Sequence, residues 1–178
     1  MKEISFYLVD AFSDRNFGGN AAAVCPLSEW LPDETLLKMA QQHNQSETAF
    51  FVCTKGGIEL RWFTTLTEVN LCGHATLAAA YVLFNELDYP DSRIHFDTAS
   101  GRLTVSREGE WMTLDFPACP TREEMPPPEM LAALGIRHYV EARKGRAWVI
   151  VLENCRQVEA LAPRFSAMTP GEHKVSVT

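Results

Sequence analysis

The sequence lacks the features that mark nucleic-acid-binding and membrane proteins. It carries 16 Lys and Arg against 23 Asp and Glu, a formal net charge of −7. Nucleic acids and anionic membranes attract clustered basic residues, so we expect neither as a partner. The longest apolar run, residues 77–84, is far too short to span a bilayer, and no apolar leader follows Met1. We therefore expect a soluble, cytoplasmic protein, and the net charge still permits a small anionic substrate.

Cysteine and the common cofactor motifs are also scarce. The five cysteines are odd in number, form no C-x-x-C pair and stand at no zinc-finger spacing from a histidine. This pattern predicts neither a disulfide framework nor a structural metal. G-x-G-x-x-G, Walker A, H-E-x-x-H and G-x-S-x-G do not occur. Dinucleotide, phosphate-loop, zincin and nucleophile-elbow functions are therefore unsupported.

What is present is a run of short strands with few helices, followed by a Pro-rich connector. Patterning and turn residues predict strands at 4–12, 21–24, 47–54, 58–64, 93–98, 102–108, 111–116, 136–142 and 147–152, and helices at 32–43, 75–84 and 129–134. Adjacent antiparallel strands with few helices predict an α+β fold. We place a first domain at 1–116, and a connector with the start of a second half at 117–178.

The helix at 75–84 has an unusual composition. Small and apolar residues surround it, and Thr76 is its only polar interruption. A helix that is apolar all round must be enclosed all round, and small residues let its neighbours approach closely. We therefore expect a central helix wrapped by a curved sheet.

Glu47 is the first candidate for chemistry. It stands between the Asn44-Gln45-Ser46 turn and an apolar strand. A carboxylate beside so much apolar surface would be partly desolvated, which suits it to proton transfer. The alternative is an ordinary exposed glutamate at the end of a strand.

The second candidate is the sequence Cys72-Gly73-His74, at the start of the apolar helix. Helix N-termini present unpaired N–H groups that bind carboxylates. Gly73 would admit a substrate close to the backbone, His74 could hydrogen-bond or shuttle a proton, and Cys72 could act as a base. The alternatives are a helix-capping histidine and a small buried cysteine.

The third candidate is Gly18-Gly19-Asn20, a turn that ends in an amide able to orient a substrate. An ordinary turn uses the same residues without any function, so that alternative stays open.

The order of these motifs resembles the phenazine-biosynthesis (PhzF-like) family. The resemblance is carried by Val-Asp-Ala-Phe at 9–12, Phe-Gly-Gly-Asn-Ala-Ala-Ala-Val at 17–24, Ser-Glu-Thr-Ala-Phe at 46–50, Phe-Thr at 63–64, Glu-Val at 68–69, Cys-Gly-His-Ala-Thr at 72–76, Thr-Ala-Ser-Gly at 98–101 and Leu-Asp-Phe-Pro at 114–117. It extends from Lys2 to about Pro163. The family implies a diaminopimelate-epimerase-like fold of two α+β halves, each a sheet curled around a central helix, with the active site between them.

The same resemblance implies an isomerase that needs neither metal nor organic cofactor. Glu47 would move a proton between two carbons of a small carboxylate. Ser46, Gly73 and His74 would hold and polarise the substrate, and Asn20 would line the pocket. Related epimerases of this fold use a cysteine where Cys72 stands, but in this branch the glutamate carries the acid/base role.

The chain departs from the family in one respect: nothing in it matches the acidic, glycine-rich motif of the second half. We interpret the chain as truncated or as one part of a pair. An uncovered apolar face predicts a homodimer, or pairing with the missing C-terminal half. Two other functions stay open: a non-catalytic binding module that retains the scaffold, and a cysteine-based racemase that pairs Cys72 with a second thiol.

Overall fold

The structure, a computed structural model, describes residues 3–15, 17–168 and 174–178. The chain divides into two units, Met1–Phe116 and Pro117–Thr178. Unit 1 holds the helices α1 (Asp33–His43) and α2 (Gly73–Asn85) and the strands β1 (Tyr7–Ala11), β2 (Asn20–Leu27), β3 (Thr48–Thr54), β4 (Gly57–Phe63), β5 (Glu68–Val69), β6 (Arg93–Thr98), β7 (Gly101–Glu108) and β8 (Trp111–Asp115).

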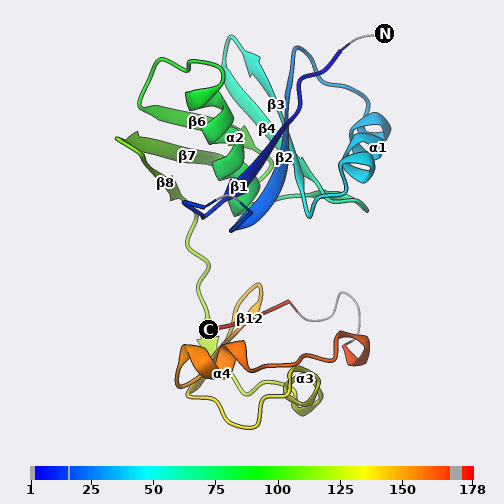
Figure 1. Cartoon of the computed structure of the whole chain (residues 1–178), viewed down its shortest axis with the longest axis vertical. Coiled ribbons are helices and arrows are strands. Elements are labelled where there is room, and N and C mark those ends of the chain that lie inside the picture. The colour runs from blue at the N-terminus through cyan, green and yellow to red at the C-terminus, as the bar shows by residue number, and fades with distance from the viewer. Residues whose placement is uncertain (1–2, 16, 169–173) are drawn as a thin grey trace. The chain divides into compact units, whose positions relative to one another are not determined.

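The strands of unit 1 form one strongly curved sheet, in the order β1-β2-β3-β4-β6-β7-β8, with β5 paired to β4. The β2–β3 and β4–β6 pairs are parallel, and the other pairs of this sheet are antiparallel. α2 lies within the curve of the sheet, and α1 lies on its outer side (Figure 1). The predicted α+β class, with a mostly antiparallel sheet curved around a central helix, is confirmed.

α2 is enclosed because its side chains are small where the sheet is close. Ala75, Ala78, Ala79 and Ala80 have no exposed surface and pack into the same core as the inner face of the sheet. Alanine adds little bulk, so the strands approach the helix backbone and larger side chains from the sheet fill the remaining space. The apolar pattern of the sequence therefore predicted the burial of most of α2 but not of all of it, since Tyr81 is 41% exposed and Leu77 is only partly buried.

The outer face of the sheet carries a second apolar cluster. Successive residues of a strand point to opposite faces, so Val24 packs toward α2 while Cys25 packs toward α1. Likewise Phe51 packs toward α2 and Phe50 packs toward α1. Because both faces are buried, β2 and β3 read as continuous apolar runs rather than as alternating ones.

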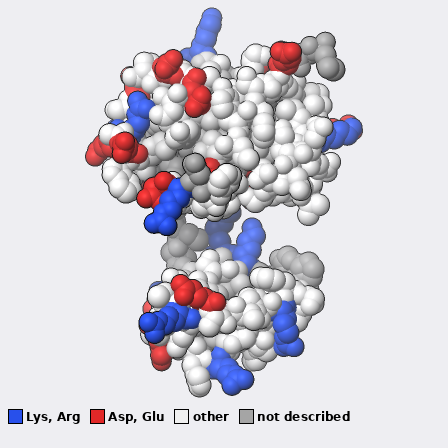
Figure 2. Space-filling model, in the orientation of Figure 1, with Lys and Arg blue, Asp and Glu red and all other residues white. Residues whose placement is uncertain are grey.

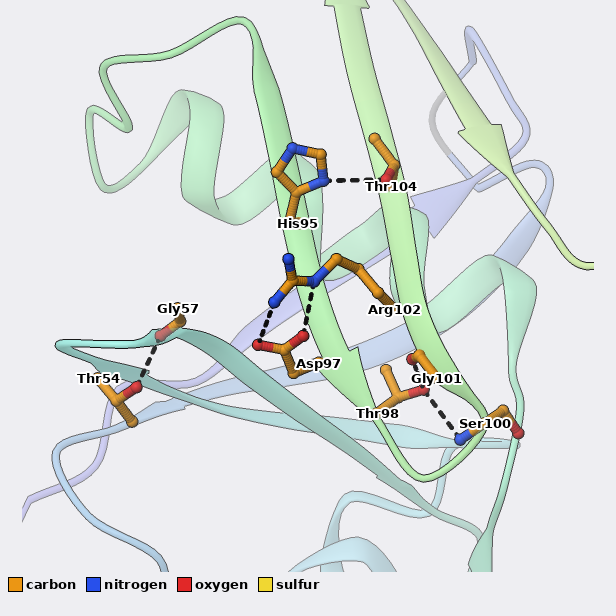
Figure 3. A network of polar contacts seen from close by, with 9 residues as sticks. All are labelled: Thr54, Gly57, His95, Asp97, Thr98, Ser100, Gly101, Arg102 and Thr104. Carbon is orange, nitrogen blue, oxygen red and sulfur yellow. Dashed lines mark hydrogen bonds and ion pairs between the residues drawn. The ribbon is translucent and has the colours of Figure 1, made fainter.

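The hairpin between β6 and β7 is held by a polar network (Figure 3). Arg102 donates from Nε and Nη2 to the Asp97 carboxylate at 2.8 and 3.2 Å, and Thr98 Oγ1 donates to the Gly101 carbonyl at 2.7 Å. On the neighbouring strand Gly57 has φ +146°, and a Cβ there would lie 3.0 Å from Asp97 Oδ2. This exposed network fixes local geometry, and pairs of this kind add little stability.

One side of the curved sheet is open. Among the described residues β1 and β8 each pair with a single neighbour, and they flank α2 from opposite edges. Between them lies a groove of about 1110 Å³ with Leu77 and Tyr81 of α2 among its lining residues. Apolar side chains stand exposed along it: Leu8 is 58% exposed, Tyr81 41% and Trp111 82%. An exposed apolar surface bounded by two free strand edges is suited to pairing with another polypeptide.

Unit 2 is a smaller α+β unit with its own core. It contains β9 (Arg122–Glu123), α3 (Pro128–Leu134), β10 (Glu141–Lys144), β11 (Trp148–Val151), α4 (Cys155–Glu159), a 3₁₀ turn (Phe165–Ala167) and β12 (Val175–Val177). Its sheet runs β12-β11-β10-β9, with β11 and β12 parallel. Met130, Leu134, Trp148 and Ile150 are buried between helix and sheet.

The strand predicted at 136–142 is wrong in position, since β10 begins only at Glu141. Gly135 ends α3 in the left-handed conformation, and the N–H of Ile136 then donates to the Leu131 carbonyl at 2.9 Å. This is a helix C-terminal motif in which the residue after glycine folds back on the last turn. Ile136 is therefore buried against α3, and its apolar character imitated the start of a strand.

Charged side chains of both signs are interspersed on the face of the protein shown in Figure 2, on each of the two units. In the portion of the chain that the structure covers, no helix is long and apolar enough to cross a membrane.

Candidate active site

Three elements of unit 1 meet at one end of the curved sheet: the start of β3, the adjacent stretch of β2, and the first turn of α2. β2 and β3 are parallel with Ala23 opposite Thr48, and the Ala23 N–H donates to the Glu47 carbonyl at 3.3 Å. Glu47 is thereby fixed just before β3. His74, in the first turn of α2, is close enough to contact it.

The turn before Glu47 is set by the end of α1. Asn44 closes the helix in the left-handed conformation, φ 53°, and its N–H donates to the Ala40 carbonyl. Asparagine is the residue other than glycine that most often takes this position. The last residue of the helix, His43, contacts Thr48 Oγ1 through Nδ1 at 3.2 Å. These contacts bring the chain directly from α1 into β3 and leave Ser46 and Glu47 facing α2.

His74 is the centre of a four-residue polar cluster. Its Nε2 lies 3.2 Å from Ser46 Oγ and 3.4 Å from Glu47 Oε2. Its Nδ1 lies 3.5 Å from Cys72 Sγ. The His74 side chain is only 9% exposed and that of Glu47 22%. The cluster is thus enclosed at the histidine and reaches solvent through the carboxylate.

The surroundings of His74 favour its neutral form. Burial lowers its pKa below the ordinary 6.5, against the Glu47 charge and a hydrogen bond with the Ala21 backbone, which act in the opposite direction. A neutral imidazole carries one N–H and one acceptor nitrogen. His74 can therefore donate a hydrogen bond on one side of its ring and accept one on the other.

Cys72 does not have the lowered thiol pKa of a reactive cysteine. Burial raises the pKa of its thiol to about 12, and the Glu47 charge acts in the same direction against a hydrogen bond with the Ala75 backbone. The thiol therefore keeps its proton near neutral pH. Thiolate is the nucleophilic and basic form, so Cys72 is a poor resting base.

Gly73 stands at the first residue of α2, after Cys72 in an extended conformation. We expected Gly73 to admit a substrate close to the backbone. Instead the ring of Phe116 occupies that space, and a Cβ on Gly73 would lie 3.0 Å from Phe116 Cε2. The small residue here accommodates an aromatic side chain. The first N–H groups of α2 still lack intrahelical partners, as at the start of any helix.

Asn20 begins β2 and is exposed. In the parallel register of β2 and β3, Ala23 lies opposite Thr48, so Asn20, three residues before Ala23, lies at the same end of the sheet as Glu47. Asn20 is not a member of the His74 cluster. The preceding Gly19 has φ +67°, and a Cβ there would overlap the Ala11 carbonyl. The turn therefore requires glycine for its own geometry, which supports the plain-turn interpretation of Gly18 and Gly19.

Sequence reasoning named Ser46, Glu47, Cys72 and His74 separately, and the structure brings all four together. It missed Phe116, the ring against Gly73, and the role of Thr76, whose hydroxyl donates to the Cys72 carbonyl at 2.5 Å. A threonine four residues after a helix cap is a usable signal, because its hydroxyl can bond back by one turn. Phe116 belongs to the Leu-Asp-Phe-Pro motif at 114–117, but nothing in that motif indicates that its ring packs against Gly73, more than forty residues earlier in the chain.

Comparison with known proteins shows which family this chain is similar to. A family model described as phenazine biosynthesis-like protein matches residues 9–177. An uncharacterised isomerase of Pseudomonas aeruginosa is 46% identical over 166 residues, which are 93% of this chain and 64% of that protein. This chain therefore spans less than two thirds of that relative's length.

Solved structures agree with this assignment. A crystal structure of a PhzF-family phenazine biosynthesis protein from Enterococcus faecalis superposes with a TM-score of 0.89 at 41% identity, covering 98% of this chain and 67% of that one. A predicted epimerase from Pseudomonas aeruginosa shares the fold, with a TM-score of 0.69 at 18% identity over 98% of this chain and 70% of its own. The curved sheet, the enclosed helix and the family match together show that this chain belongs to the phenazine biosynthesis-like (PhzF) family.

Proposed function

We propose that this chain is the N-terminal part of a cofactor-independent isomerase that moves a proton on a small carboxylate, with Glu47 as the general acid and base. The observation that carries the proposal is the position of the Glu47 carboxylate, 3.4 Å from a buried histidine and 22% exposed. Family relatives are named isomerases, which supports this reaction class.

The reaction needs one proton carrier and no change of oxidation state. Glu47 removes a proton from one carbon of the substrate, and the electron pair of that C–H bond shifts into the adjoining unsaturated system. The protonated Glu47 then returns the proton to a second carbon. A base of this kind contributes about 10²–10⁴-fold to the rate.

The neighbouring groups supply binding and orientation. Neutral His74 has a single N–H, and both Ser46 and Glu47 lie within reach of its Nε2. Its N–H therefore holds the Glu47 carboxylate in the free protein, or donates to a substrate oxygen in place of that contact when substrate is bound. The N-terminus of α2 favours a substrate carboxylate through its N–H groups and partial positive charge. Asn20 lies at the same end of the sheet and completes the polar rim.

Proton exchange tests the role of Glu47. We would measure deuterium uptake from D₂O into candidate dihydroaromatic acids for the wild-type protein, Glu47→Gln and Glu108→Gln, an exposed glutamate at the end of β7. The intact mass of the natural protein, compared with 20.0 kDa, decides whether the chain is used alone or within a longer polypeptide. We expect Glu47→Gln to lose at least about 100-fold in exchange and Glu108→Gln to keep wild-type exchange.

Two results would contradict this assignment. Exchange at the wild-type rate in Glu47→Gln would remove Glu47 as the base. Binding of the acids without any exchange by the wild-type protein would instead favour a binding module that retains the scaffold.

We also propose that the open groove of unit 1 is covered by a second copy when the 178-residue chain is alone. The free edges of β1 and β8 and the exposed Leu8, Tyr81 and Trp111 support this. Sedimentation over a range of concentrations should show a dimer. Replacing Trp111 by Lys places a charge on the edge strand and should shift the equilibrium to monomer, and a wild-type monomer at all concentrations would refute the proposal.

A further inference from the structure

The polar cluster also contains a set of metal-ligating side chains. Glu47, Cys72 and His74 each offer one ligand atom, and these atoms all lie within 4.8 Å of one another. Each ligand comes from an ordered element: Glu47 directly before β3, Cys72 at the cap of α2, and His74 in its first turn. The ligands therefore occupy one place without any large movement of the backbone.

The donor set is selective. A thiolate and an imidazole prefer zinc and similar transition ions, whereas magnesium and calcium prefer oxygen ligands only. Three protein ligands with a fourth position free is the arrangement of zinc sites that exchange water or other small ligands. We propose that Glu47, Cys72 and His74 form a site for Zn²⁺ or Co²⁺, and that the ion and the substrate compete for the Glu47 carboxylate.

One of the two ligand distances already matches such a site, the one between Cys72 Sγ and His74 Nδ1. Metal–sulfur bonds of about 2.3 Å and metal–nitrogen bonds of about 2.0–2.1 Å put tetrahedral ligands roughly 3.3–3.7 Å apart. Cys72 Sγ lies 3.5 Å from His74 Nδ1, and Glu47 Oε2 lies 3.4 Å from Nε2. The thiol and the carboxylate face opposite ring nitrogens, so one ligand must swing toward the other. Glu47 is the ligand most exposed to solvent and is free to make that adjustment.

Charge and surroundings also favour a divalent ion. The partial positive charge at the start of α2 by itself disfavours a bound cation, but the ligands outweigh it. A carboxylate and a thiolate together supply two negative charges, so the loaded site is close to neutral. On binding, the Cys72 thiol gives its proton to water as the metal–sulfur bond forms. The Ser46 hydroxyl, 3.2 Å from Nε2, orients the histidine ring, as oxygen partners commonly do for metal-bound histidines.

The expected consequence is reversible inhibition by zinc, which rests on the proposed function because it requires Glu47 to be the base. An ion bound to the Glu47 carboxylate removes its free lone pair. Substrate bound over the same carboxylate would in turn block the metal. Binding of the metal itself does not depend on the reaction and can be measured separately.

The test uses Co²⁺, whose bond to a thiolate gives an intense ultraviolet charge-transfer band. The exposed cysteines Cys53, Cys119 and Cys155 could bind cobalt adventitiously, so each is first replaced by serine. The remaining thiols are Cys72 and Cys25, which is fully buried. We expect this background protein to show the band, and the same protein with Cys72→Ser to lose it.

Glu47→Gln supplies the second measurement. It should weaken Co²⁺ binding by at least about tenfold, the smallest loss typical of removing a supporting group at a metal site, while the thiolate band remains at saturation. Glu108→Gln should bind as the background does. A band that persists without Cys72, or wild-type affinity in Glu47→Gln, would overturn the site. Metal binding without any proton exchange would leave the site intact and refute only the proposed reaction.

Discussion

Leu83 and Leu77 lie on different sides of α2 and provide a direct test of how the helix is enclosed. Leu83 is 2% exposed and belongs to the core cluster, whereas Leu77 is only partly buried beside the open groove. Leu83→Ala leaves a cavity and should lower the free energy of unfolding by about 2–5 kcal/mol. Leu77→Ala, the same substitution on the same helix, removes a side chain that is still partly hydrated and should cost about 1 kcal/mol.

Urea denaturation followed by circular dichroism and tryptophan fluorescence measures both losses. With a slope of about 2 kcal/mol per molar urea, a loss of about 3 kcal/mol lowers the midpoint by about 1.5 M. A Leu83→Ala protein as stable as wild type would refute the enclosed helix. Equal losses for the two variants would mean that Leu77 is covered in solution. If a second copy covers it, the Leu77→Ala midpoint should depend on protein concentration.

Three further predictions follow from local geometry. The free energy of unfolding should fall as the pH drops below 6.5, because the pKa of His74 is lowered in the folded protein and the unfolded chain therefore binds the proton more readily. In urea melts at a series of pH values, His74→Gln should flatten this decline. A decline of the same size in the variant would contradict the prediction. Cys72, with a thiol pKa of about 12, should react with iodoacetamide at least about 100-fold more slowly than exposed Cys119, as resolved by mass spectrometry. Gly19→Ala should destabilise by more than about 1 kcal/mol, and by more than Gly109→Ala, which also has positive φ but meets nothing within 4 Å.

The fold of unit 1 was readable from the sequence because its strongest signal is a composition that no exposed helix tolerates. Residues 75–84 could only be buried on nearly all sides, and that requirement implies a sheet curved around them. The prediction of a strand at 136–142 was wrong because its apolar signal was short and ambiguous. Ile136 is apolar because it caps α3, and short apolar runs do not distinguish a cap from a strand.

The candidate site was harder to predict, because its members come from separate elements. Sequence alone could single out Glu47 and His74, but their separation of 3.4 Å depends on the parallel pairing of β2 with β3 and on how α2 enters the sheet. The absence of zinc-finger spacing around the cysteines excluded only a local motif. Side chains that come together from positions 47, 72 and 74 leave no such pattern.

All strands of the curved sheet precede Pro117 in the chain. The core around α2 therefore needs no residue that the ribosome adds later, and unit 1 can reach its folded state while synthesis continues, as contiguous domains commonly do. During that interval the edges of β1 and β8 are exposed to other nascent chains. Slower translation after Phe116 lengthens that interval, so it should increase edge-to-edge aggregation and lower the soluble yield.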